Sequence, residues 1–343
     1  MAALAVVEHR SSALPAALRW RNFEVSGATA YQPSARQPAA GTELPAGIVP
    51  TDPAGTTAVT APVRADAVVT GKYDHGRQAR MRGFYGEEQV SVRVQAGSRD
   101  PGRSHGVSRS VRAAELVAAH CPGLAPALRD HGSVFGGRTA YLVEQIVDGA
   151  VPVGKDGVLA ALTAVARDLG SVQRAVGLEP RRLSSVLPAD FPEQWQAVVE
   201  DGLVPPDSAA AVDRLIARDD FLDVSFTHGD LVATNILRVP GGVILVDWEF
   251  AGFAPVAFDL AKLHINAGPP GPAVDLLDRT LKGAVGHRHG HYTLAEQLLL
   301  AHVEVISRLE RRMSKARRTR RVPQLQRQTR RRVRALGELL ALG

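Results

Sequence analysis

The alternation of hydrophobic and polar residues in the first half of the chain predicts short strands. Between residues 90 and 94 every second residue is valine, which is the period of a strand that buries one face. An earlier strand-like run ends at Val69, and a glycine-containing turn at 71–76 follows it. Residues 139–145 read as another strand, and residues 108–120 have helical spacing. We expect an antiparallel sheet accompanied by one helix.

Beyond residue 149 the spacing of apolar residues becomes mainly helical. Two short apolar runs, 236–239 and 243–246, are joined by Pro-Gly-Gly, which predicts a β-hairpin. The predicted helices repeat apolar residues every three to four positions and are separated by breaks. They cover residues 157–176, 191–202, 207–220, 258–265, 294–312 and a last segment from Pro323 onwards.

These changes of pattern divide the chain into three parts. Residues 1–60 are rich in Ala, Pro, Gly and Thr and have weak periodicity, so we expect an irregular N-terminal extension. Residues 61–148 hold the predicted sheet, and the turn at Asp148 and Gly149 ends that part. Residues 149–343 are mainly helical. The expected fold class is α+β with two lobes.

Composition agrees with a folded chain of that organisation. The 343 residues are 45% hydrophobic and 22% charged, which is enough for a sizeable core. Cys121 is the one cysteine, so no intrachain disulfide can form and we expect a reducing compartment, the cytoplasm. The first apolar run, at 2–7, is short and is followed by charged residues. Neither a signal peptide nor a membrane span is predicted.

Charge is distributed unevenly along the chain. Between Arg308 and Arg334, thirteen Lys or Arg residues stand against one acidic residue, so this basic segment carries +12. The whole chain carries +6, and the remainder therefore sums to −6. The segment suits three roles that the sequence leaves open: a lining for an anionic substrate, contact with nucleic acid or a membrane surface, or a solvated helical face.

Three oxygen-bearing side chains near the predicted hairpin have the chemistry that phosphoryl transfer requires. This reaction needs a carboxylate that accepts the proton of the attacking hydroxyl, and oxygen ligands that hold magnesium against the phosphates. Asp230 and Asn235 lie five residues apart on a loop, and Asp247 follows the second strand of the hairpin. Because a hairpin returns the chain to nearly the same place, we expect Asp247 to lie beside Asn235.

The segments HGDLVATNIL and VILVDWE, followed by FDLAKL, resemble the aminoglycoside phosphotransferase and choline kinase group, which are relatives of the protein kinases. The resemblance implies a bilobal protein-kinase-like fold, with a small antiparallel sheet lobe and a larger, mainly helical lobe. It also implies ATP or GTP as phosphoryl donor together with Mg²⁺. Asp230 would be the catalytic base, Asn235 and Asp247 magnesium ligands, and Asp247 would replace the first residue of the Asp-Phe-Gly motif.

The same resemblance implies supporting residues around the loop. His228 is expected to hydrogen-bond backbone near Asp247 and so to fix the loop, rather than to act as a base. Asp259, in FDLAKL, is expected to support the catalytic loop from a distance in sequence. Glu249 is open between a role in the site and a role as a turn residue.

On the nucleotide side the sequence departs from the family. Where the family has a strand lysine that grips the α- and β-phosphates, this chain offers Arg93, whose planar guanidinium binds phosphate differently. Lys72, in the glycine-containing turn, is the rival cation. Glu115 would be the helical partner of that cation, although its register is shifted from that of the family's glutamate. Glu144 and Ile146 belong to a segment whose backbone would bind an adenine or guanine ring.

Two classes of function follow from these observations. The first is a kinase for a hydroxyl group of a small molecule, either an antibiotic in resistance or self-resistance, or a sugar, nucleoside or amino-alcohol metabolite. The second is a non-catalytic kinase-like protein that binds a nucleotide, or a nucleic acid through its basic segment. The complete set of Asp230, Asn235 and Asp247 favours the kinase, because a binding module needs no proton acceptor.

The acceptor and the oligomeric state are left open by the sequence. Glu193, Glu200 and Asp201, on the expected acceptor side, are compatible with a polycationic aminoglycoside, whereas the basic segment suits an anion. The alternating histidines of GHRHGHY could hold a transition metal. With no cysteine or carboxylate next to them in the sequence, a solvated loop is the favoured interpretation.

Overall fold

The computed structural model describes residues 23–25, 48–50, 63–69, 78–85, 88–96, 106–134, 139–318 and 320–342. They fall into two compact units. The sheet unit holds the described residues up to Ala119, together with Ala125–Asp148 and Asp247–Phe250. The helical unit holds His120–Leu124, Gly149–Val246 and the residues from Ala251 onwards.

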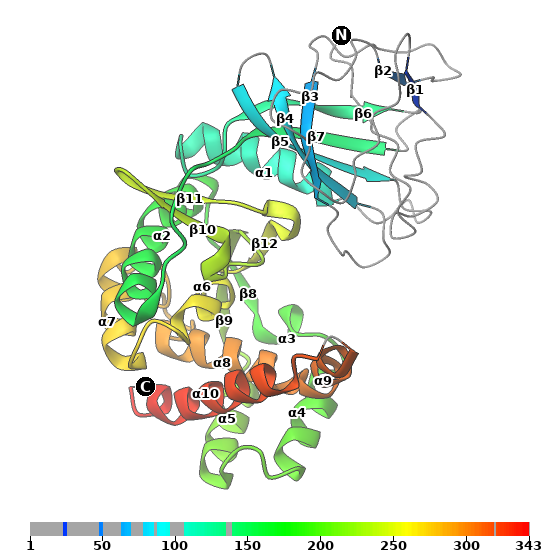
Figure 1. The fold of residues 1–343 in the computed structure, drawn as a ribbon. Helices are drawn as coiled ribbons and strands as arrows, with labels where there is room; N and C mark the ends of the chain where they lie inside the picture. The colour runs from blue at the N-terminus through cyan, green and yellow to red at the C-terminus, as the bar shows by residue number, and fades with distance from the viewer. Residues whose placement is uncertain are drawn as a thin grey trace. The chain divides into compact units, whose positions relative to one another are not determined.

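The sheet unit is built on an antiparallel sheet of five strands in the order β3-β4-β5-β7-β6 (Figure 1). At its centre, Val92 lies opposite Val143 and Arg93 opposite Leu142. Val92 and Arg93 point to opposite faces and are both buried, so both faces of the central strand are covered at this point. The strands are β3 (Val63–Val69), β4 (Gln78–Tyr85), β5 (Glu88–Ala96), β6 (Leu128–Val134) and β7 (Thr139–Gln145).

Helix α1 (Gly106–His120) packs against this sheet. Val107 and Val111, one helical turn apart, form a buried cluster with Ala140 and Leu142 of β7. Each fully buried aliphatic side chain of this kind stabilises the fold by roughly 1.5–3 kcal/mol. The Val107 amide, which has no partner within the helix, donates to the Gln95 side chain at 2.9 Å.

The strands and the helix predicted for this part of the chain are confirmed, and the antiparallel sheet with them. The pattern did not assign β4 a range of its own, and β6 was missed because its sequence LRDHGSV is mostly polar. Within the N-terminal extension the structure describes two short strands, β1 (Phe23–Val25) and β2 (Ile48–Pro50), which pair with each other. The rest of the extension and the turn that carries Lys72 lie outside the described residues.

The helical unit is organised around α8 (Leu294–Ser307), which contacts α4, α6 and α10. Figure 1 shows α8 in orange beside α10 in red. Most residues of α8 are buried, including the polar Gln297 and His302. The other helices are α2 (Gly154–Val176), α3 (Leu183–Val186), α4 (Phe191–Glu200), α5 (Pro206–Arg218), α6 (Val256–His264), α7 (Pro270–Leu281), α9 (Leu309–Arg318) and α10 (Val322–Leu340).

Two small antiparallel sheets complete the helical unit. The predicted hairpin is present as β10 (Ile236–Val239) and β11 (Gly242–Leu245), and its end is held by the Leu245 amide, which donates to the Leu124 carbonyl at 2.7 Å. The second sheet has the order β12-β9-β8. Its strands are β8 (Glu179–Arg182), β9 (Phe221–Thr227) and β12 (Gly252–Pro255).

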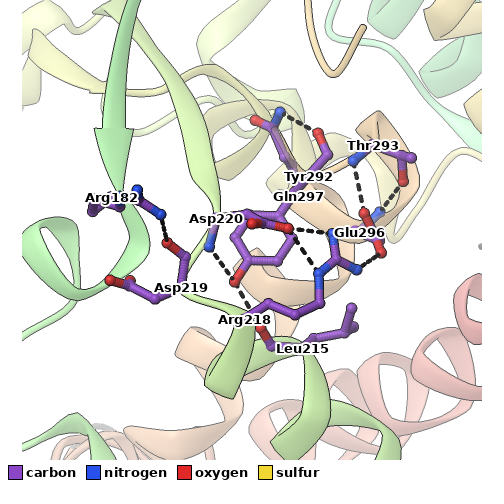
Figure 2. A network of polar contacts seen from close by, with 9 residues as sticks. All are labelled: Arg182, Leu215, Arg218, Asp219, Asp220, Tyr292, Thr293, Glu296 and Gln297. Carbon is purple, nitrogen blue, oxygen red and sulfur yellow. Dashed lines mark hydrogen bonds and ion pairs between the residues drawn. The ribbon is translucent and has the colours of Figure 1, made fainter. Parts of the chain in front are cut away.

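A polar network fixes the start of β9 relative to α5 and α8 (Figure 2). Arg218, at the end of α5, contacts the carboxylates of Asp220 and Glu296. The Tyr292 hydroxyl donates to the Leu215 carbonyl at 2.6 Å. Glu296 also completes a capping box with Thr293 at the N-terminus of α8. The strand β9, which leads into the loop that carries Asp230, therefore begins at a well-connected junction.

The predicted helices are present, with one correction. The single helix expected over 294–312 is broken at Arg308 into α8 and α9. The sequence patterns also missed α7 and the strands β8, β9 and β12. Within the described part of the chain, every helix is too short or too polar to span a bilayer.

Candidate active site

The loop 228–235 joins β9 to β10 and carries Asp230 and Asn235. After its first residue β9 is buried throughout, so the point at which the loop begins is fixed by packing. Gly229 has a φ of +78°, a conformation that glycine adopts without steric cost. A short 3-10 turn, Ala233–Asn235, then leads into β10.

The carboxylate of Asp259, on α6, holds the loop by its backbone. Its Oδ2 accepts from the His228 amide at 2.7 Å and its Oδ1 accepts from the Leu231 amide at 3.3 Å. Asp259 is 4% exposed, so these charge-assisted bonds form away from water. They fix the backbone on both sides of Asp230.

The imidazole of His228 links the loop to the end of the hairpin. Its Nε2 lies 2.9 Å from the Val246 carbonyl, and its Nδ1 lies 3.3 Å from the Asp230 amide. A carbonyl can only accept and a backbone amide can only donate, so the Nε2–H tautomer satisfies both contacts. His228 is completely buried. It therefore ties the Asp230 backbone to the residue that precedes Asp247.

The side chain of Asn235 is oriented by the same loop. Its Nδ2 donates to the Asp230 carbonyl at 2.9 Å, and its backbone carbonyl accepts from the Val246 amide at 3.0 Å. Because the amide nitrogen is used in this way, Oδ1 is the atom of this side chain that is left for a cation. Val246 is the last residue of this segment of the helical unit, and the chain enters the sheet unit at Asp247.

The Asp230 carboxylate is more accessible than its supports and, among the described residues, has one cationic neighbour. It is 43% exposed, and Oδ1 lies 3.3 Å from Lys262 Nζ. Lys262 also donates to the Gly229 carbonyl at 2.5 Å. Sequence analysis missed Lys262. The available signal was its position three residues after Asp259 on one helix, a spacing that places two side chains on the same face.

Asp247, the third predicted residue, lies in the sheet unit with an uncommon backbone conformation. Its φ is +71°, which few residues other than glycine adopt and which aspartate tolerates better than most. Its Oδ1 accepts from Arg93 at 3.1 Å. Backbone strain of this kind, about 1 kcal/mol or more, is concentrated at functional sites.

Arg93 is a buried cation held between two carboxylates. It is 1% exposed, and its second terminal nitrogen donates to Glu144 at 3.1 Å. Its Nε is buried without a hydrogen-bond partner among the described residues. Glu144 and Asp247 each present a carboxylate to this guanidinium. Carboxylate oxygens are ligands of the kind that Mg²⁺ prefers.

The remaining nucleotide-side residues are placed as follows. Glu115 does not reach Arg93; it is half exposed and lies 3.4 Å from His131. Ile146 follows the end of β7. Glu249 accepts through its backbone carbonyl from Arg109 at 2.6 Å. Lys72 is outside the described residues.

The alternating histidines have separate surroundings. His287 contacts Asp278 at 2.7 Å, and His289 is exposed. His291 is buried instead, with Nδ1 3.0 Å from Asp223 Oδ1 but out of hydrogen-bond alignment. The solvated loop expected here is therefore wrong for His291. Across the described residues, no three His, Cys, Asp or Glu side chains cluster so as to hold a metal ion.

Phosphoryl transfer uses a carboxylate that accepts a proton and oxygen ligands for a metal ion. The fixed loop offers the Asp230 carboxylate and the Asn235 amide oxygen, and Asp247 offers a separate carboxylate beside a buried cation. The family model described as "Phosphotransferase enzyme family" matches residues 99–292, which is more than half of the chain. The chain belongs to this family. Its members are ATP-dependent kinases that phosphorylate hydroxyl groups, so this phosphotransferase is an enzyme of that class. The matched residues include the loop and the hairpin and end before the basic segment.

The bilobal protein-kinase-like fold is shared with a solved structure. Aminoglycoside phosphotransferase APH(4)-Ia, in complex with AMP-PNP and hygromycin B, matches with a TM-score of 0.50 and 14% identity, over 79% of this chain and 94% of that chain. Choline kinase LicA from Streptococcus pneumoniae matches with a TM-score of 0.49 and 15% identity, over 79% and 93%. Among curated proteins, none matches this sequence significantly.

Proposed function

We propose that this phosphotransferase moves the γ-phosphoryl group of ATP or GTP to a hydroxyl group of a small molecule, with Asp230 as the catalytic base. The observation that carries the proposal is the catalytic loop. Asp259, His228 and Asn235 hold the backbone around Asp230, while the carboxylate itself stays 43% exposed. A carboxylate fixed in this way can accept a proton with little reorganisation.

In this mechanism Asp230 accepts a hydrogen bond from the acceptor hydroxyl and aligns its oxygen with the γ-phosphorus. The new oxygen–phosphorus bond forms as the bond to the β–γ bridging oxygen breaks, and the nucleoside diphosphate leaves. The hydroxyl proton passes to Asp230. General-base catalysis of this kind contributes about 10²- to 10⁴-fold to the rate.

Asn235 and Asp247 are the residues that we propose to hold Mg²⁺. The orientation of the Asn235 amide and the carboxylate oxygens of Asp247 support this assignment. When bound, the ion neutralises charge on the phosphates. The positive φ of Asp247 supports a functional role for that residue, because a strained backbone is retained where the surrounding structure requires it.

On the nucleotide side we propose that Arg93 serves as the family's strand cation. Its two ion pairs support a role in holding the Asp247 and Glu144 carboxylates in place. The segment that contains Ile146 would present backbone groups to the nucleobase. The AMP-PNP bound to APH(4)-Ia supports ATP as the donor. For Lys72 and Glu115 the nucleotide-side role stays a prediction.

The acceptor that we propose is an antibiotic or a related alcohol, because the structural relative APH(4)-Ia is seen with hygromycin B. A metabolite alcohol is the second candidate, and the basic segment favours it over a polycationic antibiotic. The single cysteine supports a reducing compartment, such as the cytoplasm, for this reaction.

The test of the proposal is a panel of antibiotics, sugars, nucleosides and amino alcohols, each incubated with the full chain, Mg²⁺ and either ATP or GTP. Mass spectrometry should detect an acceptor that gains one phosphate, and removal of Mg²⁺ by chelation should stop the gain. Nucleotide binding without transfer to any member of the panel, or transfer that survives chelation, would contradict the proposal.

A further inference from the structure

Arg332, on α10, is a buried cation without a carboxylate in hydrogen-bond reach among the described residues. It is 7% exposed. One terminal nitrogen donates to Nδ1 of His302 at 2.6 Å, and Nε is buried without any hydrogen-bond partner. Its surroundings therefore satisfy part of its hydrogen bonding but do not balance its charge.

The histidines beside Arg332 are neutral. His302 Nε2 lies 3.2 Å from His264 Nδ1, and His264 Nε2 lies 3.4 Å from the Pro270 carbonyl. Arginine can only donate and a carbonyl can only accept, so each imidazole carries its proton on Nε2. Burial, reinforced by the charge of Arg332, holds the pKa of His302 well below its usual value. No charge in this chain of contacts offsets the guanidinium.

A second cation near Arg332 also lacks a partner. Arg312, on α9, is half-buried and makes no side-chain hydrogen bond or ion pair with another described residue. Burial lowers its pKa, which the nearby Glu304 carboxylate opposes. Glu304 is already paired with Arg308 at 2.5 Å.

These residues form one electrostatic group, the basic cluster, which consists of Lys262, Arg308, Arg312 and Arg332 around Glu304. Burial raises the pKa of the Glu304 carboxyl, while all four cations act to lower it. With the Asp230 carboxylate that contacts Lys262 also counted, these four cations and two carboxylates carry a net charge of +2. Uncompensated charge in a buried place costs free energy that a bound anion would recover.

The basic cluster adjoins the catalytic loop. Lys262 belongs to the cluster and lies 3.3 Å from the Asp230 carboxylate. Helices α8 and α10 pack side by side, as Figure 1 shows, and α9 joins them, so that Glu304, Arg312 and Arg332 come from consecutive helices. All of these residues lie in the helical unit.

We propose that the basic cluster binds an anionic group, a carboxylate or a phosphate, carried by the hydroxyl acceptor of this phosphotransferase. The inference rests on the proposed function, since Asp230 marks where the acceptor hydroxyl lies. Guanidinium groups bind such oxyanions through parallel N–H donors, and both Arg312 and the Nε of Arg332 have donors without a partner among the described residues. The same cluster would repel a polycationic aminoglycoside.

The kinetic test uses pairs of acceptors that differ in one anionic group: sugar acids with the corresponding sugars, and nucleoside monophosphates with the corresponding nucleosides. The wild type should prefer the anionic member. In Arg312→Gln that preference, measured as kcat/KM, should fall by about ten- to a hundredfold, as for loss of charge-assisted hydrogen bonds. Arg312→Lys should recover part of it. Arg311→Gln, which alters the exposed neighbour on the same helix, is the matched control and should change little.

A binding test separates this inference from the proposed function. Thermal unfolding is followed with inorganic phosphate and with chloride at equal ionic strength, for wild type, Arg312→Gln and Arg311→Gln. Phosphate should raise the Tm of wild type and Arg311→Gln and should have a smaller effect on Arg312→Gln.

The two tests distinguish a failure of the anion site from a failure of the proposed kinase activity. An equal response of all three proteins to phosphate overturns the anion site, whether or not a kinase activity is found. Neutral acceptors used as well as anionic ones, with no effect of Arg312→Gln, also overturn it. A phosphate response that depends on Arg312, with no transfer to any acceptor, supports the anion site and contradicts the proposed kinase.

Discussion

Arg93 and Arg332 are both buried arginines, but their surroundings are opposite. Arg93, on β5, is held by the carboxylates of Glu144 and Asp247, each at 3.1 Å. Arg332, on α10, is held by the neutral imidazole of His302 and has an unpaired Nε. One cation is compensated within the protein and the other is not.

The difference shows how the two regions use charge. A buried ion pair with good geometry offsets much of its own desolvation cost, so the guanidinium of Arg93 is balanced by carboxylates of the protein. An unpaired buried cation is costly, and proteins retain such costs mainly where function requires them. The comparison predicts that substitutions in the two regions have different consequences for stability and for activity.

The largest effect expected is a loss of stability in mild acid that originates in the α10 region. Burial lowers the pKa of His264 from 6.5 to about 4, and that of His302 is lowered as well. Between pH 6.5 and about 4 the unfolded chain therefore binds more protons than the folded chain, so stability falls as pH falls. His264 should remove about 1.5–2 kcal/mol from the free energy of unfolding between pH 6.5 and 5, and His302 should add to this loss.

Denaturant unfolding at a series of pH values measures how steeply the free energy of unfolding falls as pH falls. His289→Gln, which alters an exposed histidine, should keep this pH dependence, whereas the double variant His264→Gln with His302→Gln should lose most of it. A wild-type free energy of unfolding that is constant from pH 7 to pH 5 would show that the two imidazoles are not held neutral.

In the strand region, Arg93→Met should lower the free energy of unfolding by about 2–3 kcal/mol. The substitution removes the guanidinium that the carboxylates of Glu144 and Asp247 share, and the partial exposure of both limits the cost. Arg93→Lys keeps the charge and should cost about 1 kcal/mol. Chemical denaturation at pH 7 checks both values. An Arg93→Met variant as stable as wild type would contradict the claim that Arg93, unlike Arg332, is compensated by its carboxylates.

Where the basic cluster meets the catalytic loop, Lys262→Met should lower kcat by about tenfold and the free energy of unfolding by about 1 kcal/mol. The reason is the loss of the ammonium that contacts the Gly229 carbonyl and the Asp230 carboxylate. Steady-state kinetics with the acceptor found in the panel measures the first effect. Lys155→Met, on an exposed position of α2, is the control. Equal kcat in the two variants would exclude Lys262 from the site.

The smallest effect on stability is expected for Arg332→Met. The lost hydrogen bond to His302 and the relief of a buried charge oppose each other, so the free energy of unfolding should stay within about 1 kcal/mol of wild type. The same denaturation series measures it. A loss as large as that of Arg93→Met would mean that Arg332 is compensated in a way that its contacts do not show.

Much of the fold could be predicted from the sequence because local periodicity carries it. The strand β5 and the helices α1, α2 and α5 follow the expected patterns. The strand β9 was missed because Asp223 interrupts its apolar run. That carboxylate is completely buried and accepts from the Gln297 side chain and the Gly286 amide, residues far away in the sequence. Such long-range compensation leaves no local signal.

The loop residues of the candidate site could be named in advance because HGD, the asparagine and DWE lie close together along the chain. The partners of Arg93 could not be named in advance, because Glu144 is distant in sequence and Glu115, on the helix, was the expected partner. Arg332 was hidden among the many arginines of the basic segment. The usable signal was its place in the buried stripe of Leu325, Thr329, Arg332, Leu336 and Leu339, which repeats at alternating intervals of four and three residues.

The central claim, that Asp230 is the base of a phosphoryl transfer, is tested most directly by Asp230→Asn with nucleotide affinity and turnover measured separately. The account predicts that turnover of the bound complex falls by about 10²- to 10⁴-fold while the Kd for nucleotide changes little. An Asp230→Asn protein that binds nucleotide poorly but turns over normally once it is bound would contradict the account.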